Sequence, residues 1–120
     1  MVLTRKATHF TPDLVMKDDS LHFSGKLWME NPPEYFAEIF ERTRKSNSNR
    51  FSVRLDVEHL NSSCTKQLLL YFKLLREMND AGKFKEIEIV WNIASDDDDM
   101  EDSIQGLASI CDVNIKIGKK

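Results

Sequence analysis

The chain has 120 residues, of which 41% are hydrophobic and 31% charged, as expected for one soluble globular domain that needs no metal or disulfide to form a core. A formal net charge of −3 without a basic stripe argues against a nucleic-acid partner, and no apolar run approaches the roughly 20 residues that cross a bilayer. Two cysteines are too few for a disulfide framework and the N-terminus lacks the apolar stretch of a signal peptide, so we expect a cytoplasmic protein without membrane insertion.

The first predicted elements form an antiparallel hairpin, in which Leu14–Met16 and Leu21–Phe23 flank the polar turn 17–20. A helix is predicted to start at Asn31, because a capping residue is followed by two prolines and then by Glu34, three residues after the cap. One face of this helix is apolar and consists of Tyr35, Phe36, Ile39, Phe40 and Thr43. The polar segment Ser46–Arg50 is predicted to be a loop.

The middle of the chain changes from the period of a strand to the period of a helix. Phe51, Val53, Leu55 and Val57 alternate with polar residues, which predicts a strand with one buried face. After residues 61–63, apolar residues recur at steps of three or four, which predicts a helix packed on one side. These positions are Cys64, Leu68, Phe72 and Leu75. Ala81-Gly82 marks the end of this helix.

The last third repeats the alternation of strand and helix. A strand is predicted by the alternation of Ile87, Ile89 and Trp91 with polar residues. A helix is predicted to start at a cap, Ser95 or Asp96, and to run to about Ile110. A closing strand is predicted from Val113, Ile115 and Ile117. From Phe51 the order is β-α-β-α-β, which favours parallel strands with right-handed crossovers. The predicted fold class is therefore α/β: a single domain, residues 1–120, whose small mixed sheet joins an N-terminal antiparallel hairpin to a parallel part.

Asn61-Ser62-Ser63 lies between the carboxyl end of a predicted strand and the start of a predicted helix. A helix start presents unpaired N–H groups and the positive end of the helix dipole, which stabilise an anionic group. The position therefore suits a phosphoacceptor serine. Spacing alone favours ordinary helix capping, with one of the two serines as the cap.

Two further patterns suggest chemistry and are weaker. The acidic run Asp96–Asp99 lacks the sixth-position glycine of an EF-hand, so it is interpreted as a solvated helix start or as part of a partner surface near the serines. Cys64 with His59 suggests a nucleophile, but Cys64 belongs to an apolar series and is expected to face the core. We therefore expect no enzyme activity, no cofactor and no metal.

Three motifs in order resemble the SiaC-type family of bacterial regulatory phosphoproteins and, more distantly, STAS-like anti-sigma-factor antagonists. The first is Leu60-Asn61-Ser62-Ser63-Cys64-Thr65-Lys66, similar to the family's Leu-Asn-Thr-Ser-Ser followed by lysine. The second is Ser24-Gly25 followed by Glu30-Asn31, although the family's Tyr-Pro before Glu-Asn is missing. The third is Trp91 followed by an acidic loop ending in Met100-Glu101. The resemblance covers roughly residues 20–117.

The resemblance implies an STAS-like fold and a role for each motif. Ser62 is the expected phosphoacceptor, with Ser63 as the second choice, and Asn61 and Lys66 support the loop. The possible partner surface consists of Trp28, Glu30, Asn31, Asp96, Asp97, Asp98 and Asp99. The missing Tyr-Pro leaves open whether the surface near Trp28 binds the family's usual partner.

The function implied is a phosphorylation-switched interaction module whose unphosphorylated form binds and regulates a diguanylate cyclase, in cyclic-di-GMP signalling and biofilm control. The implied partners also include a Ser/Thr protein kinase and a PP2C-like phosphatase. One alternative is an STAS-like antagonist that captures an anti-sigma kinase. Another is a small-ligand or metal sensor that uses the acidic loop.

Overall fold

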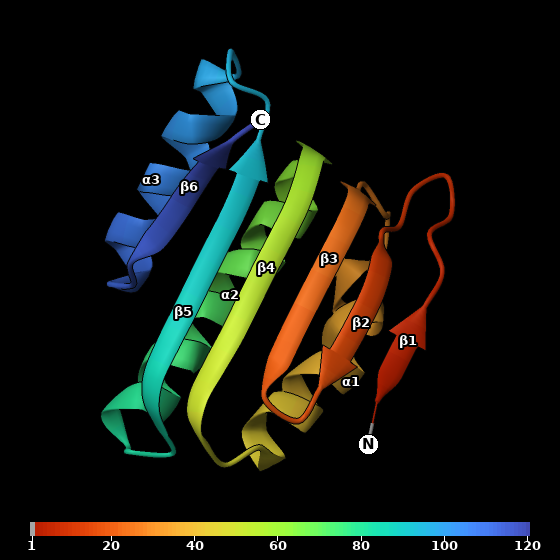
Figure 1. Ribbon diagram of the computed structural model, residues 1–120. Helices are drawn as coiled ribbons and strands as arrows, with labels where there is room; N and C mark the ends of the chain where they lie inside the picture. Colours follow the sequence, from red (N-terminus) through yellow and green to blue (C-terminus); the bar gives the residue numbers. More distant parts are fainter. Residues whose placement is uncertain (1) are drawn as a thin grey trace.

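The structure is a computed structural model that describes residues 2–120. Six strands form one sheet in the order β1-β2-β3-β4-β5-β6, and three helices lie behind it on one face (Figure 1). The strands are β1 Leu3–Arg5, β2 Asp13–Lys17, β3 Ser20–Leu27, β4 Ser48–Leu60, β5 Phe84–Ile93 and β6 Ile115–Lys119. The helices are α1 Pro32–Lys45, α2 Ser62–Asp80 and α3 Asp98–Cys111.

The predicted fold class is confirmed, and the parallel part begins one strand earlier than predicted. β1, β2 and β3 pair antiparallel, whereas β3, β4, β5 and β6 are all parallel neighbours. One helix connects the two strands of each parallel pair. Because these crossovers are all right-handed and run in the same direction across the sheet, all three helices lie on the same face. Because the strand order never reverses, the sheet has no topological switch point, where a ligand crevice would otherwise open.

The core lies between the sheet and the helices. The predicted alternation in β4 is confirmed, since Phe51, Val53, Leu55 and Val57 are buried while their neighbours are not. Trp91 of β5 is fully buried, and its indole N–H donates to the carbonyl oxygen of Val57 at 3.0 Å. The opposite face of the sheet carries mostly polar side chains, among them Ser52, Arg54 and Asp56 of β4.

Several predicted boundaries need correction. Ser46–Arg50 is not a loop throughout, because β4 begins at Ser48 and pairs with β5 from that residue. β1 was not predicted. The cap of α3 is Asp97 rather than Ser95 or Asp96, because a turn in which the Asp97 N–H donates to the Ala94 carbonyl delays the helix.

The closing strand also begins later than predicted. Val113 belongs to the C-terminal cap of α3 and not to β6. Its N–H donates to the carbonyl of Ala108, and the preceding residue, Asp112, has a left-handed conformation with φ of 54°. At the start of α1, Asn31 occupies the predicted cap position without a side-chain capping hydrogen bond. Its amide instead donates to the Glu34 carboxylate at 2.9 Å.

Candidate functional site

The serine motif lies where β4 ends and α2 begins, at the carboxyl edge of the parallel strands. Asn61 is the N-cap of α2, and its side-chain oxygen accepts a hydrogen bond from the backbone N–H of Cys64 at 2.8 Å. The expectation that one of the serines caps the helix is therefore wrong. Asn and Ser are nearly equal as caps, so composition could not decide between them.

Asn61 also fixes this helix start to the end of β3. Its backbone N–H donates to the Leu27 carbonyl at 3.2 Å, and its side-chain amide donates to the Met29 carbonyl at 3.2 Å. The loop after β3 and the start of α2 are thereby held together through one side chain and its backbone.

Ser62 and Ser63 are the first two residues of α2, and both are exposed. Within residues 2–120 their backbone N–H groups have no backbone acceptor, as is normal in the first turn of a helix. Lys66 is also exposed and lies four residues after Ser62, so it occupies the same face of the helix one turn on. A phosphate on Ser62 would have helix N–H groups and a lysine within reach.

The acidic loop approaches this helix start. A hollow of 280 Å³ brings together Trp28, Thr65, Asp97 and Asp99, which come from the segments after β3 and β5 and from α2 and α3. Asp97 also caps α3 by accepting from the Met100 N–H at 3.1 Å, and Asp98, Asp99 and Glu101 lie in the first turn of that helix. The acidic residues thus form a helix start, as one of the two interpretations predicted.

The expected partner surface is only partly brought together. Glu30 lines a second hollow of 560 Å³ with Trp28 and Asn61, whereas Asn31, Asp96 and Asp98 line neither of these two hollows. Sequence reasoning missed Phe10, which lines the second hollow beside Trp28. The sequence signal that could have indicated Phe10 is its position as an aromatic residue within the Thr8–Pro12 turn, because turns lie on the surface.

Cys64 is fully buried among the apolar residues of α2, as predicted. Burial raises the pKa of its thiol, which disfavours the thiolate that nucleophilic chemistry requires. Among residues 2–120, no group of three His, Cys, Asp or Glu side chains is arranged to hold a metal ion. No helix in the described part of the chain is long and apolar enough to span a membrane.

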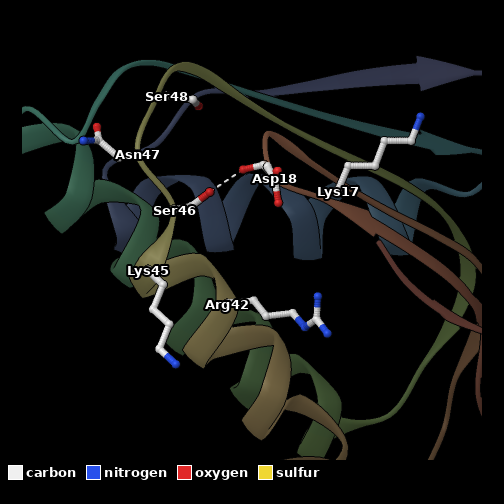
Figure 2. A pocket seen from close by; sticks show the side chains of 7 residues that line it. All are labelled: Lys17, Asp18, Arg42, Lys45, Ser46, Asn47 and Ser48. Carbon is white, nitrogen blue, oxygen red and sulfur yellow. Dashed lines mark hydrogen bonds between the residues drawn. The ribbon is translucent and has the colours of Figure 1, made fainter. Parts of the chain in front are cut away.

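A cavity of 400 Å³ lies at the opposite edge of the sheet, near the β2–β3 turn and the start of β4. Lys17, Arg42 and Lys45 line it, but their charged ends point in different directions (Figure 2). Arg42 pairs with Glu38 and Lys45 with Glu41, and the Ser46 hydroxyl donates to the Asp18 carbonyl. The cations therefore do not converge on one anion position.

Fold and site together define a small α/β domain that presents two serine hydroxyls at a helix start, beside an acidic loop. The chain belongs to the SiaC family of regulatory phosphoproteins, whose sequence profile matches residues 5–120.

Solved structures agree with this assignment of the fold. Apo-SiaC from Pseudomonas aeruginosa superposes with a TM-score of 0.81 at 20% identity, with 98% of each chain covered. The crystal structure of the diguanylate cyclase SiaD in complex with its activator SiaC, from the same organism, gives a TM-score of 0.87 at 18% identity over 98% of this chain and 99% of the matched chain. A search of curated protein sequences found no significant match.

Proposed function

We propose that this protein is a phosphorylation-switched regulator, and not an enzyme, whose unphosphorylated form binds and regulates a diguanylate cyclase. Membership of a family of regulatory phosphoproteins supports this, and a structurally similar member, SiaC of Pseudomonas aeruginosa, activates the cyclase SiaD. The observation that carries the proposal is the exposed hydroxyl of Ser62 at a helix start that Asn61 caps.

Ser62 is the acceptor in this proposal, with Ser63 as the second choice. The position between Asn61 and Lys66 is the one that the family resemblance marks, and Lys66 lies on the same helical face as Ser62. Because Asn61 makes the capping hydrogen bond, modification of the Ser62 hydroxyl leaves the cap in place. The helix start also stabilises the added anion.

The phosphate acts on the partner surface. It adds about −1.5 to −2 charges at pH 7 and three strongly hydrated acceptor oxygens. Glu58, Asp97 and Asp99 already line the hollow beside this helix start, so the added charge makes an acidic edge more acidic. A partner that desolvates this edge in the unphosphorylated state loses affinity when the phosphate is present.

The switch requires an enzyme for each direction. A Ser/Thr protein kinase adds the phosphate and a PP2C-like phosphatase removes it, both in the cytoplasm, where the regulated output is cyclic-di-GMP and hence biofilm control. Both serines are exposed, so a kinase can reach either hydroxyl.

The experiment measures cyclic-di-GMP synthesis and binding by titration calorimetry, with the purified diguanylate cyclases of the encoding bacterium. Wild type, phospho-protein, Ser62→Ala, Ser62→Asp and the neighbouring control Ser63→Ala are compared. Wild type, Ser62→Ala and Ser63→Ala should bind one cyclase and change its rate, whereas the phospho-protein should not. Equal binding by phosphorylated and unphosphorylated protein contradicts the switch. Capture of an anti-sigma kinase in place of any cyclase would favour the STAS-like alternative.

A further inference from the structure

Phe10 and Trp28, here called the aromatic pair, are exposed residues that line the same two hollows beside the serine motif. The two residues are 52% and 47% exposed, and the backbone N–H of Trp28 donates to the Phe10 carbonyl at 3.0 Å. Both residues line two hollows, of 240 Å³ and 560 Å³, and the larger one also reaches Asn61, the residue before Ser62. Exposed apolar side chains that gather around a shared hollow are a feature of interaction sites.

The loop that carries Phe10 is held in place by its own hydrogen bonds. The Thr8 hydroxyl contacts the Thr11 hydroxyl at 2.6 Å and accepts from the backbone N–H groups of Phe10 and Thr11. Asp13 accepts from the Ala7 N–H at 2.8 Å and closes the base of the loop. These hydrogen bonds fix the backbone geometry that places Phe10 on the surface.

The strand beneath the loop adopts a conformation that depends on glycine. Gly25 has a φ of +127°, a Cβ at this position would lie 3.3 Å from the Pro12 Cα, and the register of β3 with β4 shifts between Gly25 and Lys26. This irregularity allows Pro12 to approach the backbone of β3 closely at Gly25, which brings the loop against the segment that carries Trp28. The aromatic pair thus depends on a specific backbone arrangement.

The charges around the pair differ between its two sides. The smaller hollow is lined by Lys26, His9 and His59 as well as the aromatic residues, and the ion pairs within residues 2–120 do not include Lys26. Glu30 lines the larger hollow, and Glu58, Asp97 and Asp99 line the 280 Å³ hollow, which also reaches Trp28. A bound carboxylate is stabilised beside Lys26 and repelled beside Asp97 and Asp99.

We infer that Phe10 and Trp28 are the docking site for a partner-protein segment that carries an apolar side chain next to a carboxylate. The apolar side chain packs against the two rings, and the carboxylate pairs with Lys26, which fixes the orientation of the segment. The identity of this partner as the one released by phosphorylation rests on the proposed function. An acidic segment explains why release works, since a phosphate on Ser62 repels it.

Two peptide probes test the site independently of any cyclase. The ¹⁵N-labelled full chain is titrated with acetyl-Glu-Glu-Leu-Phe-Ser-Ser-amide, which carries carboxylates on one side of its apolar residues only, and with the matched acetyl-Lys-Lys-Leu-Phe-Ser-Ser-amide, followed by NMR. The acidic peptide should shift the Trp28 indole and Phe10 amide signals and bind at least about fivefold more tightly than the basic one, a preference typical of charge complementarity. Equal binding of the two peptides, shifts centred elsewhere or no shifts would overturn the inference.

Variants separate the apolar contribution from the charge. Phe10→Ser and Trp28→Ser should each weaken the acidic peptide about tenfold or more, as loss of an anchor residue does. Lys26→Glu leaves both rings in place and should reverse the preference between the peptides. Ile110→Ser is the matched control, because Ile110 is 62% exposed on α3 and is outside the site. A loss with the control equal to that with Phe10→Ser would contradict the assignment.

The same variants distinguish this inference from the proposed function. If wild type regulates a cyclase and Phe10→Ser, Trp28→Ser and Lys26→Glu do so equally well, the docking site is wrong and the switch remains. If the acidic peptide docks at Trp28 but no cyclase responds, the proposed function is wrong and the docking site remains. Sedimentation that shows a wild-type dimer abolished by Phe10→Ser would assign the surface to a second copy and overturn the inference.

Discussion

The side-chain oxygen of Asn61 accepts a hydrogen bond from the backbone N–H of Cys64 at 2.8 Å, which satisfies one of the free donors of the first turn of α2. The amide of the same side chain donates to the Met29 carbonyl. Capping and attachment to the β3 loop therefore both depend on Asn61. The Ser62 hydroxyl takes part in neither.

Removal of the Asn61 side chain should destabilise the protein more than removal of either serine hydroxyl. Asn61→Ala loses a helix cap, which costs about 0.5–2 kcal/mol, while Ser62→Ala and the control Ser63→Ala should stay within about 0.5 kcal/mol of wild type. Urea unfolding measures the free energy of each variant. A Ser62→Ala loss as large as that of Asn61→Ala would make the serine the structural cap.

Asp56 links three strands on the sheet face that no helix covers. Its carboxylate accepts hydrogen bonds from His22 at 2.7 Å and Asn92 at 2.8 Å, and it pairs with Arg54 at 3.1 Å. Partial burial alone would raise the pKa of Asp56, but the hydrogen bonds from His22 and Asn92 and the charge of Arg54 outweigh it and hold the pKa below its usual value.

Because the pKa of Asp56 is lower in the folded protein than in the unfolded chain, its carboxylate stabilises the fold above the unfolded value of about 4. This stabilisation is lost as the pH falls through the folded pKa. Asp56→Asn should therefore lower the free energy of unfolding at neutral pH, by an amount that shrinks below about pH 4. Urea unfolding across this range, with the exposed Asp102→Asn as control, measures the difference. A difference that does not vary with pH would contradict the assignment.

Gly118 leaves room for the Asn92 side chain. A Cβ at Gly118 would lie 2.1 Å from the Asn92 Oδ1, so Gly118→Ala must displace the amide that donates to Asp56. We expect a loss of about 1 kcal/mol, the typical contribution of such a hydrogen bond. In an Asn92→Ala background the same change should be neutral or stabilise by up to about 1 kcal/mol, because alanine suits a strand interior better than glycine. Additive effects in this double-mutant cycle would contradict the coupling.

The sequence predicted those helices and strands whose buried apolar residues recur with a clear period. The alternation of Phe51, Val53, Leu55 and Val57 and the helical repeat after Cys64 follow directly from a one-sided core. The start of β4 at Ser48 was missed because its polar residues join the sheet through backbone pairing with β5, not through an apolar pattern. The three residues of β1 are too few to show a period.

The relative placement of the serine motif and the acidic loop was predicted, because sheet topology determines it. Ser62 and the acidic loop share one edge because they follow parallel strands, and the hollow that contains Thr65, Asp97 and Asp99 agrees with this reasoning. The position of Phe10 against Trp28 could not be predicted, because it depends on the conformation of the loop between two antiparallel strands and on the irregular backbone at Gly25.

Phosphate mapping tests the acceptor. After incubation with each Ser/Thr protein kinase that the neighbouring genes encode, peptide mapping by mass spectrometry should find the phosphate on Ser62, and Ser62→Ala should abolish it while the control Ser63→Ala should not. Phosphate found only on Ser63, Thr65 or Ser95 would defeat the assignment. A protein left unmodified by every kinase encoded nearby would defeat the switch.

Phosphorylation of Ser62 should change binding and leave the fold intact. The first N–H groups of α2 and the nearby Lys66 stabilise the added charge, while Asn61 keeps the cap, so the melting temperature of the phospho-protein should stay within a few degrees of that of wild type. Thermal unfolding and titration calorimetry on the same phospho-protein, with Ser62→Asp as a weaker imitation, separate the two effects. Loss of partner binding at an unchanged melting temperature is the expected result. A melting temperature that falls in step with affinity would mean that the phosphate acts by disrupting the helix start and not by repelling the partner.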